Sequence, residues 1–388
     1  MRPSPREQIL DAEPDRLPPV LDDDGIGGRL ADQWTAFNAF LHENPNTPIY
    51  AITTLTGHRD REGVRLTPAA INRAIADSHY FAPESDPDPR LWRLITLCKL
   101  TQLSMGGVPL RVELFDALRE GARSGEFTGR VDLQSSYSCG DVIPGCQWAL
   151  QWLDALGVSI EDLAPGEMIA LINGAFVHLG AALWSMERLD APLAREVSQS
   201  RRARDMLIQS GRHDGAQLPV SFRAVRQSRS AVRAMADHAG AVIDRLLGAP
   251  SGNPLFHAGP PPGFESQDSF MSCELAVIQS GLIEAILAMA WTITQRIKHL
   301  CAVHDDGAGA DNPIALIQHP KRAESILQLM RLQNGGRTFA SGGETSEGIE
   351  DFWSRGAHLS MAISALAGQL TQLLAVEAQV LARIESRS

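Results

Sequence analysis

The sequence has little cysteine and no paired cysteine motif. Its five cysteines are an odd number, and none of them forms a C-x-x-C pair: Cys98, Cys139, Cys146, Cys273 and Cys301. This spacing fits neither a zinc site nor a disulfide framework. Reduced thiols are typical of the cytoplasm, and no apolar leader follows Met1. We therefore expect a cytoplasmic protein without a signal peptide and without a metal site.

Basic and aromatic residues are also few. The 388-residue chain has 35 Lys and Arg against 46 Asp and Glu, a formal net charge of -11. An acidic chain without a basic patch is a poor partner for nucleic acid or an anionic membrane surface, so we expect neither. Aromatic residues make up 6% of the chain and include only three tyrosines, which makes each tyrosine a candidate for a specific role.

The long apolar stretches are interrupted by polar residues. The most apolar windows are 168–184, which contains Asn173, and 273–293, which contains Gln279 and Glu284. Neither is a clean run of about 20 apolar residues, so we expect helices buried in a bundle rather than membrane spans. Polar residues in such helices also suggest that the helices are shared between subunits. The alternative is a monomeric bundle that satisfies its buried polar groups.

Helical periodicity dominates the rest of the chain. Apolar spacing predicts helices over 91–103, 110–121, 166–186, 231–247 and, most clearly, 359–384. A short alternation over 48–54 is the best strand candidate. We predict a mostly α fold of long packed helices, with a loose, proline-rich arm at 1–28, an N-terminal region at 29–200 and a long-helix bundle at 201–388.

Seven short stretches contain most of the candidate functional residues. They are Y-A-I-T-T-L-T-G at 50–57, S-C-G at 138–140, L-I-N-G at 171–174, Q-L-P-V-S-F-R at 217–223, S-G-N-P-L at 251–255, Q-D-S-F-M at 267–271 and T-S-E-G-I-E-D at 345–351. Their succession resembles the histidine/phenylalanine ammonia-lyase family, the aromatic amino acid lyases that use a methylidene-imidazolone (MIO) group. The resemblance covers most of the chain and implies a divergent member that lacks the family's C-terminal helical extension.

The resemblance implies an electrophile made from the backbone. In the family, a tripeptide matching Ser138, Cys139 and Gly140 cyclises to MIO, and its middle residue loses the β-heteroatom. Glycine suits the tight turn of this cyclisation. Cys139 stands where the family has serine, which leaves two outcomes open. The thiol leaves as hydrogen sulfide and MIO forms, or the cysteine stays intact and the protein has no MIO.

The resemblance also assigns roles to two further catalytic candidates. Tyr50 matches the family tyrosine proposed to remove the β-proton, and Glu350 matches a glutamate that contacts the amine. A half-buried core tyrosine and a solvated loop carboxylate are the alternatives.

Substrate contacts are implied by the same resemblance. Asn173 would hydrogen-bond the MIO carbonyl or the substrate, and Arg223 would grip the substrate carboxylate with its planar fork. His79 would lie near the substrate ring, and Phe270 would pack over the prosthetic group. Each residue also has a structural alternative: a helix-interior amide for Asn173, a surface ion pair for Arg223, a satisfied core histidine for His79 and a plain core aromatic for Phe270.

Three positions depart from the family by exchanging a polar group for an apolar one. They are Val220, Met271 and Ile349. We expect these substrate-binding positions to make the pocket drier and less able to handle an ammonium group. The missing extension would open the site to solvent or to a bulky, carrier-borne substrate.

Three functions remain open at this stage. The first is an MIO-type lyase or aminomutase acting on an aromatic amino acid or derivative. The second is an MIO-less homologue that catalyses an acid–base cyclisation or a heteroatom addition or elimination in secondary metabolism. The third is a non-catalytic helical scaffold. Joint retention of Tyr50, Gly140, Asn173, Arg223 and Glu350 disfavours the third. The resemblance further implies a homotetramer with active sites shared between chains.

Overall fold

The computed structural model describes residues 3–60, 66–137, 139–211, 217–304, 316–334 and 345–386. The fold is mostly α, as predicted. The chain forms two compact units, and both are discontinuous in sequence. The first comprises 1–184, 240–276 and 339–358, and the second comprises 185–239, 277–338 and 359–388. This division differs from the contiguous regions predicted, because α8, α10, α11 and α13 each contribute residues to both units.

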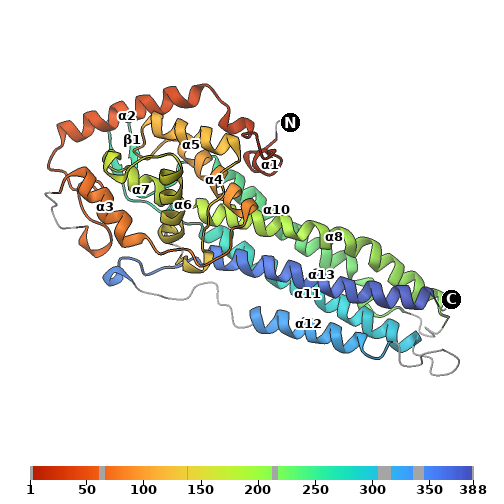
Figure 1. Ribbon diagram of the computed structural model, residues 1–388. Coiled ribbons are helices and arrows are strands. Elements are labelled where there is room, and N and C mark those ends of the chain that lie inside the picture. Colours follow the sequence, from red (N-terminus) through yellow and green to blue (C-terminus); the bar gives the residue numbers. More distant parts are fainter. Residues whose placement is uncertain are drawn as a thin grey trace. The chain divides into compact units, whose positions relative to one another are not determined.

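The first unit is built from short and medium helices and one small hairpin (Figure 1). Its helices are α1 (Pro5–Leu10), α2 (Gly25–Glu43), α3 (Pro68–His79), α4 (Pro89–Ser104), α5 (Val112–Ser124), α6 (Val142–Ala155), α7 (Glu167–Ile172) and the start of α8 (Phe176–Gln209). Strands β1 (Leu255–His257) and β2 (Gly263–Glu265) pair antiparallel. Single 3-10 turns occur at Pro19–Leu21, Gly57–Arg59, Leu133–Ser135, Ile160–Asp162 and Ser346–Gly348.

The second unit is a bundle of long helices. Besides most of α8 it contains α9 (Val220–Arg223), α10 (Val225–Leu247), α11 (Cys273–His304), α12 (His319–Asn334) and α13 (Gly356–Glu385). Figure 1 shows α8, α11 and α13 running side by side. The predicted apolar stripe of α13 is buried at Leu366, Leu370, Leu373, Leu374, Leu381 and Ile384. That periodicity explains why the helix packs along its whole length.

Several buried polar groups of the bundle pair with one another within the chain, although a few buried oxygens, such as those of the Gln199 and Gln369 amides, have no partner. The Arg296 guanidinium is fully buried and donates to the carboxylates of Glu377 at 2.8 Å and Glu196 at 3.2 Å, which joins α8, α11 and α13. The buried Gln279 amide donates to the Ser360 hydroxyl at 2.8 Å. Interrupted apolar stretches in the sequence therefore correspond to buried polar contacts between helices.

Among the residues that the structure describes, three helical stretches are long and apolar enough to cross a membrane, judged by length and composition alone. They are 167–209, 273–304 and 356–385, and 94%, 56% and 61% of their most apolar windows are buried in the protein. The sequence analysis predicted buried bundle helices for the first two, and the polar residues that interrupt them do not lower their mean hydropathy below that of a possible span. The absence of a membrane partner stays a prediction.

Two local predictions need correction. The candidate strand at 48–54 is a turn, in which the Ile49 carbonyl accepts hydrogen bonds from the backbone amides of 52, 53 and 54. The Thr53 hydroxyl closes the turn by accepting from the Ile49 amide at 2.7 Å. The segment 1–28, predicted as a loose arm, contains helix α1. Two side chains of this segment, Ile9 and Leu21, are fully buried. Burial of these apolar side chains orders the segment.

Candidate functional site

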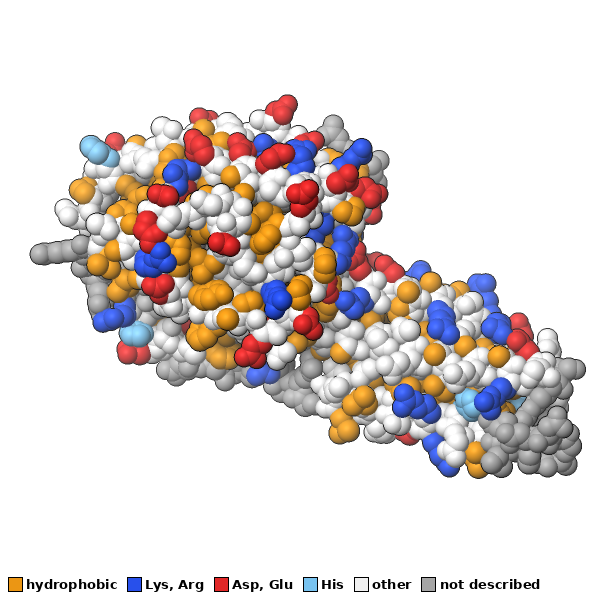
Figure 2. Space-filling model, in the orientation of Figure 1, with side chains coloured by type: hydrophobic (Ala, Val, Ile, Leu, Met, Phe, Trp, Pro, Cys, Tyr) orange, Lys and Arg blue, Asp and Glu red, His pale blue; other side chains and the backbone are white. Residues whose placement is uncertain are grey.

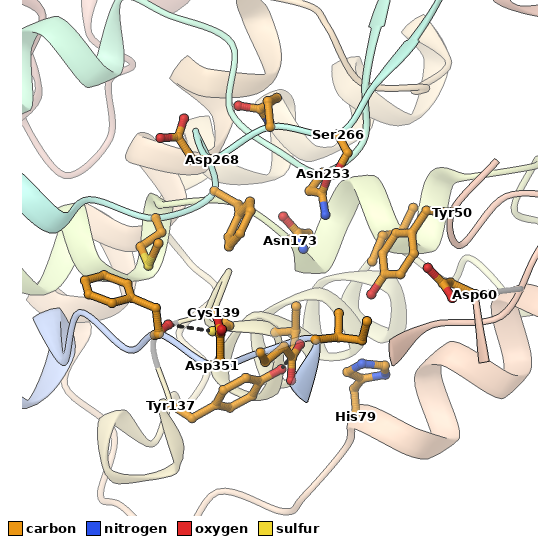
Figure 3. Close-up of a pocket in the computed structure, with 18 of the residues that line it drawn as sticks. Tyr50, Asp60, His79, Tyr137, Cys139, Asn173, Asn253, Ser266, Asp268 and Asp351 are labelled. Carbon is orange, nitrogen blue, oxygen red and sulfur yellow. Dashed lines mark hydrogen bonds between the residues drawn. The ribbon is translucent and has the colours of Figure 1, made fainter. Parts of the chain in front are cut away.

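A cavity of about 800 Å³ lies in the first unit and is lined by segments far apart in the sequence (Figure 3). It brings together eight positions singled out from the sequence: Tyr50, His79, Cys139, Asn173, Phe270, Met271, Ile349 and Glu350. Gly140 lies against Asn173 beside the cavity. Ser138 lies outside the described residues. Val220 and Arg223 belong to α9 in the second unit, and the side chains of these two residues are exposed.

Tyr50 is placed by the turn at 48–54. Ala51 adopts a left-handed conformation with a φ of 58°, which folds the chain back after Tyr50. The phenol oxygen accepts a hydrogen bond from the Gly57 amide at 3.3 Å. Burial raises the pKa of Tyr50, and the carboxylates of Glu350 and Asp60 add to the effect. The side chain therefore carries its proton at neutral pH and is a proton donor in this state.

Asn173 is placed by a break in the predicted helix over 166–186. Helix α7 ends at Ile172, and α8 begins only at Phe176. The buried side-chain nitrogen of Lys99 stabilises the end of α7 by donating to the carbonyl of Ala170 at 2.6 Å and that of Asn173 at 2.8 Å. The side-chain oxygen of Asn173 is buried and has no hydrogen-bond partner. An orphaned amide oxygen in a cavity marks a place where a ligand group can bind.

The turn at Cys139 and Gly140 packs directly on Asn173. Gly140 has a φ of 71°, and a Cβ there would lie 2.8 Å from the Asn173 amide nitrogen. Only glycine fits this approach without displacing Asn173. The Cys139 thiol donates to the Phe352 carbonyl at 3.3 Å. Burial and the nearby Glu350 carboxylate raise the pKa of Cys139 to about 12, so the thiol is neutral rather than a thiolate.

Glu350 is held by its own loop. Its Oε2 atom accepts from the Thr345 hydroxyl at 2.8 Å and the Ser346 hydroxyl at 3.0 Å. The Tyr137 hydroxyl donates to Oε1 at 3.5 Å. In Figure 3 the hydroxyls of Tyr50 and Tyr137 point toward the space between them. The sequence analysis did not assign Tyr137, although its place just before the matched tripeptide and the rarity of tyrosine were available signals.

His79 ends helix α3 and has a defined tautomer. Its Nδ1 atom lies 2.8 Å from the Ile75 carbonyl, which can only accept a hydrogen bond. Nδ1 therefore carries the proton, and Nε2 keeps its lone pair. Burial lowers the pKa of His79, so the imidazole is neutral at pH 7. A neutral imidazole with a vacant lone pair can accept a proton from a bound molecule.

The charged side chains that line the cavity are acidic. They are Asp60, Asp268, Glu350 and Asp351, and the described lining residues include neither lysine nor arginine. This corrects the expectation of a drier pocket that handles ammonium poorly, because carboxylates in loops offset the apolar exchanges at Met271 and Ile349. Asp60 lies outside the matched stretches and carries no local sequence pattern, whereas Asp268 and Asp351 lie within matched stretches but were not assigned a role.

The predicted absence of a metal is not tested by the structure. Among the residues that the structure describes, no group of three or more His, Cys, Asp or Glu side chains is placed to hold a metal ion.

The sequence itself matches no protein-family model and no curated protein. Solved structures, by contrast, match over nearly the whole chain. Phenylalanine aminomutase from Pantoea agglomerans is 14% identical, with a TM-score of 0.80 over 99% of this chain and 89% of that one. The ergothioneine-degrading enzyme ergothionase from Treponema denticola is 15% identical, with a TM-score of 0.81 over 93% and 84%.

Histidine ammonia-lyase from Trypanosoma cruzi is 16% identical, with a TM-score of 0.72 over 94% of this chain and 79% of that one. At these identities the likeness concerns the fold. The predicted resemblance is confirmed at that level, and the chain has the fold of the aromatic amino acid ammonia-lyases and aminomutases.

Proposed function

We propose that this protein is an ammonia-lyase-like enzyme, a lyase or aminomutase that acts at the α- and β-carbons of an aromatic amino acid or a derivative. The observation that supports this most is the single cavity in which Tyr50, Cys139, Asn173 and Glu350 meet from four distant segments. A protein that used this fold only as a scaffold would have no need to keep these groups together. Structural neighbours that include a phenylalanine aminomutase and a histidine ammonia-lyase support the same reaction class.

The residues around Cys139 fit an MIO group. A Cβ on Gly140 would collide with Asn173, so this position needs glycine, which also suits the tight turn that cyclisation of 138–140 requires. The orphaned side-chain oxygens of Asn173 and Asn253 both belong to residues that line the cavity. When formed, the group would supply an electrophile that draws electrons from the substrate amine or ring.

The other groups of the cavity would handle protons and charge. In the elimination, the β-proton is removed, its bonding electrons form the Cα=Cβ bond, and the Cα–N bond breaks with its electron pair on nitrogen. His79 can accept a proton through Nε2, and the protonated Tyr50 can donate one. If Tyr50 is the base, as the resemblance implies, it must first lose its proton against the raised pKa. The carboxylate of Glu350 would hold the amine.

The direct test is turnover with aromatic amino acids. Purified protein incubated with phenylalanine, tyrosine or histidine is expected to release ammonia with an α,β-unsaturated acid, or to form the β-amino acid. Ammonia assay, ultraviolet absorbance and chiral chromatography separate these products. Failure to consume any of the three, or ring-substituted analogues, would count against the proposal.

A specific observation favours a second candidate, the MIO-less enzyme. The Cys139 thiol is neutral, buried and hydrogen-bonded to the Phe352 carbonyl, which are the conditions in which a cysteine persists unreacted. The same cavity would then perform acid–base chemistry with Tyr50 and His79 alone. Such chemistry includes a cyclisation, or the addition or elimination of a heteroatom that leaves more easily than an amine. These reactions do not need an electrophile as strong as MIO.

Arg223 is outside the cavity of its own chain and would reach a site only in another copy of the proposed tetramer. On that basis, Arg223→Ala is expected to weaken binding of a carboxylate-bearing substrate or inhibitor by roughly 10- to 100-fold, as loss of a charge-assisted hydrogen bond worth about 1.5–3 kcal/mol requires. Its exposed position in α9 predicts little effect on folding. Arg226→Ala, an exposed arginine three residues away, is the matched control. Calorimetric titration measures the difference, and equal affinities in the two variants would remove Arg223 from the site.

We further propose a homotetramer. The second unit leaves large apolar side chains exposed on its helices, among them Trp291 at 41%, Leu329 at 47% and Leu332 at 79%. Figure 2 shows hydrophobic side chains reaching the surface in view. Large apolar side chains that come together on a surface are candidates for burial by association. Light scattering is expected to give four times the 42.1 kDa chain mass, and a stable monomer would contradict the proposal.

A further inference from the structure

A second cavity of about 270 Å³ lies in the first unit and shares no lining residue with the first. Helix α4, the end of α5, the loop that follows it and helix α6 form its walls. Ala12 and Pro14 of the N-terminal segment close it on another side. Its volume is near the lower limit for small-molecule sites, and so it has room for one substituted ring.

One wall is an aromatic cluster. Trp92 stacks on Trp152 with ring centroids 6.0 Å apart, and Phe127 meets both rings edge to face at 5.5 and 5.0 Å. All three residues line the cavity. Flat rings that already prefer stacked and edge-to-face contacts offer the same contacts to a planar aromatic ligand.

Two N–H donors on lining residues have no acceptor. The Trp92 side chain is 3% exposed, and its indole nitrogen is buried without a hydrogen-bond partner. The indole nitrogens of Trp148 and Trp152 both donate to the Thr96 hydroxyl. The Arg93 Nε atom is also buried and unpartnered, although its other nitrogens donate to backbone carbonyls of Glu13, Arg16 and Ala122. A buried donor without an acceptor is costly, which favours a ligand that brings one.

The charge of this cavity is opposite to that of the first. Its charged lining residues are Arg90 and Arg93, and no carboxylate is among the described residues that line it. Burial lowers the pKa of Arg93 but leaves it a cation at neutral pH. Two guanidinium groups and two vacant N–H donors disfavour a cationic ligand and suit a carboxylate.

We propose that this cavity is a second small-molecule site, which binds a planar aromatic monocarboxylate. The ring stacks on the wall of Trp92, Trp152 and Phe127, and the carboxylate accepts from the Trp92 indole and the Arg93 Nε atom. Binding here does not depend on turnover in the acidic cavity. An α,β-unsaturated aryl acid, the product class of the proposed elimination, has this chemistry, and only this identification rests on the proposed function.

Calorimetric titration of the full chain with benzoate tests the proposal. Benzamide serves as the neutral isostere and cyclohexanecarboxylate as the non-planar acid. We expect benzoate to bind at least tenfold more tightly than either. Equal affinity for benzamide would overturn the carboxylate assignment, and equal affinity for cyclohexanecarboxylate would overturn the stacking.

Two variants locate the site. Thr128 is exposed and lines the cavity, so Thr128→Trp fills the mouth without disturbing the core. Ser124→Trp, exposed and outside the lining, is the matched control. Thr128→Trp is expected to weaken benzoate binding at least tenfold, and Ser124→Trp to leave it unchanged. Trp92→Phe keeps a ring but removes the donor, and a several-fold loss is expected. Benzoate that binds equally to wild type and Thr128→Trp would show that its site is elsewhere and overturn the proposal.

Discussion

Removing the Tyr50 hydroxyl with a Tyr50→Phe substitution is expected to lower kcat by about 10²- to 10⁴-fold, the usual contribution of a positioned acid or base. The hydroxyl lies in the cavity, where its raised pKa keeps a proton available for transfer. Among the described residues, the hydroxyl has one hydrogen bond, which it accepts from the Gly57 amide at 3.3 Å, so the cost to folding should be about 1 kcal/mol or less.

The three tyrosines of the chain provide the controls. Tyr80→Phe changes a residue that is 42% exposed and outside the cavity lining, so its kcat should equal that of wild type. Tyr137→Phe removes the 3.5 Å hydrogen bond to Glu350 and is expected to have an intermediate effect. Steady-state kinetics and thermal unfolding of the three variants separate catalysis from stability. A Tyr50→Phe enzyme as active as Tyr80→Phe would exclude Tyr50 from the chemistry.

Cys139→Ala is expected to abolish ammonia release, whereas Cys139→Ser is expected to keep it. Alanine has no β-heteroatom to expel, so the exocyclic methylene of MIO cannot form, but serine can lose water where cysteine loses hydrogen sulfide. Cys139 is buried beside Gly140, and both replacements are smaller than the thiol or similar to it, so the fold should persist.

Cys146→Ala is the matched control, because Cys146 is buried nearby in sequence but does not line the cavity. Activity is read with the ammonia assay, and circular dichroism confirms folding. Full activity of Cys139→Ala would show that the reaction proceeds without MIO and would favour the MIO-less candidate.

The fold could be predicted from the sequence because its signals are distributed along the chain. Apolar periodicity located α4 and α13, and the ordered motifs indicated the lyase fold. The strand predicted at 48–54 failed because alternating β-branched and aromatic residues also suit a turn. That turn depends on hydrogen bonds to Ile49, which periodicity does not encode.

Residues of the candidate site could be predicted only where they belong to a matched sequence motif. Tyr50, Cys139, Asn173 and Glu350 came from matched stretches and do share one cavity. Asp60 lies outside every matched stretch and becomes a site candidate only through the tertiary fold, which places it at the cavity. Asn173 lies at the break between α7 and α8, where the buried Lys99 of α4 donates hydrogen bonds to the end of α7. Contacts of this kind are not visible in local sequence patterns.

The intact mass of the purified protein tests the central claim most directly. If 138–140 cyclise, the protein is lighter than its sequence by one water and one hydrogen sulfide. Four of the five cysteine thiols then titrate after denaturation, and borohydride removes a near-ultraviolet absorbance. This is the result that we predict. An unmodified mass with all five thiols titrating would contradict the ammonia-lyase proposal, because none of the other described groups that line the cavity is electrophilic enough to activate the leaving amine.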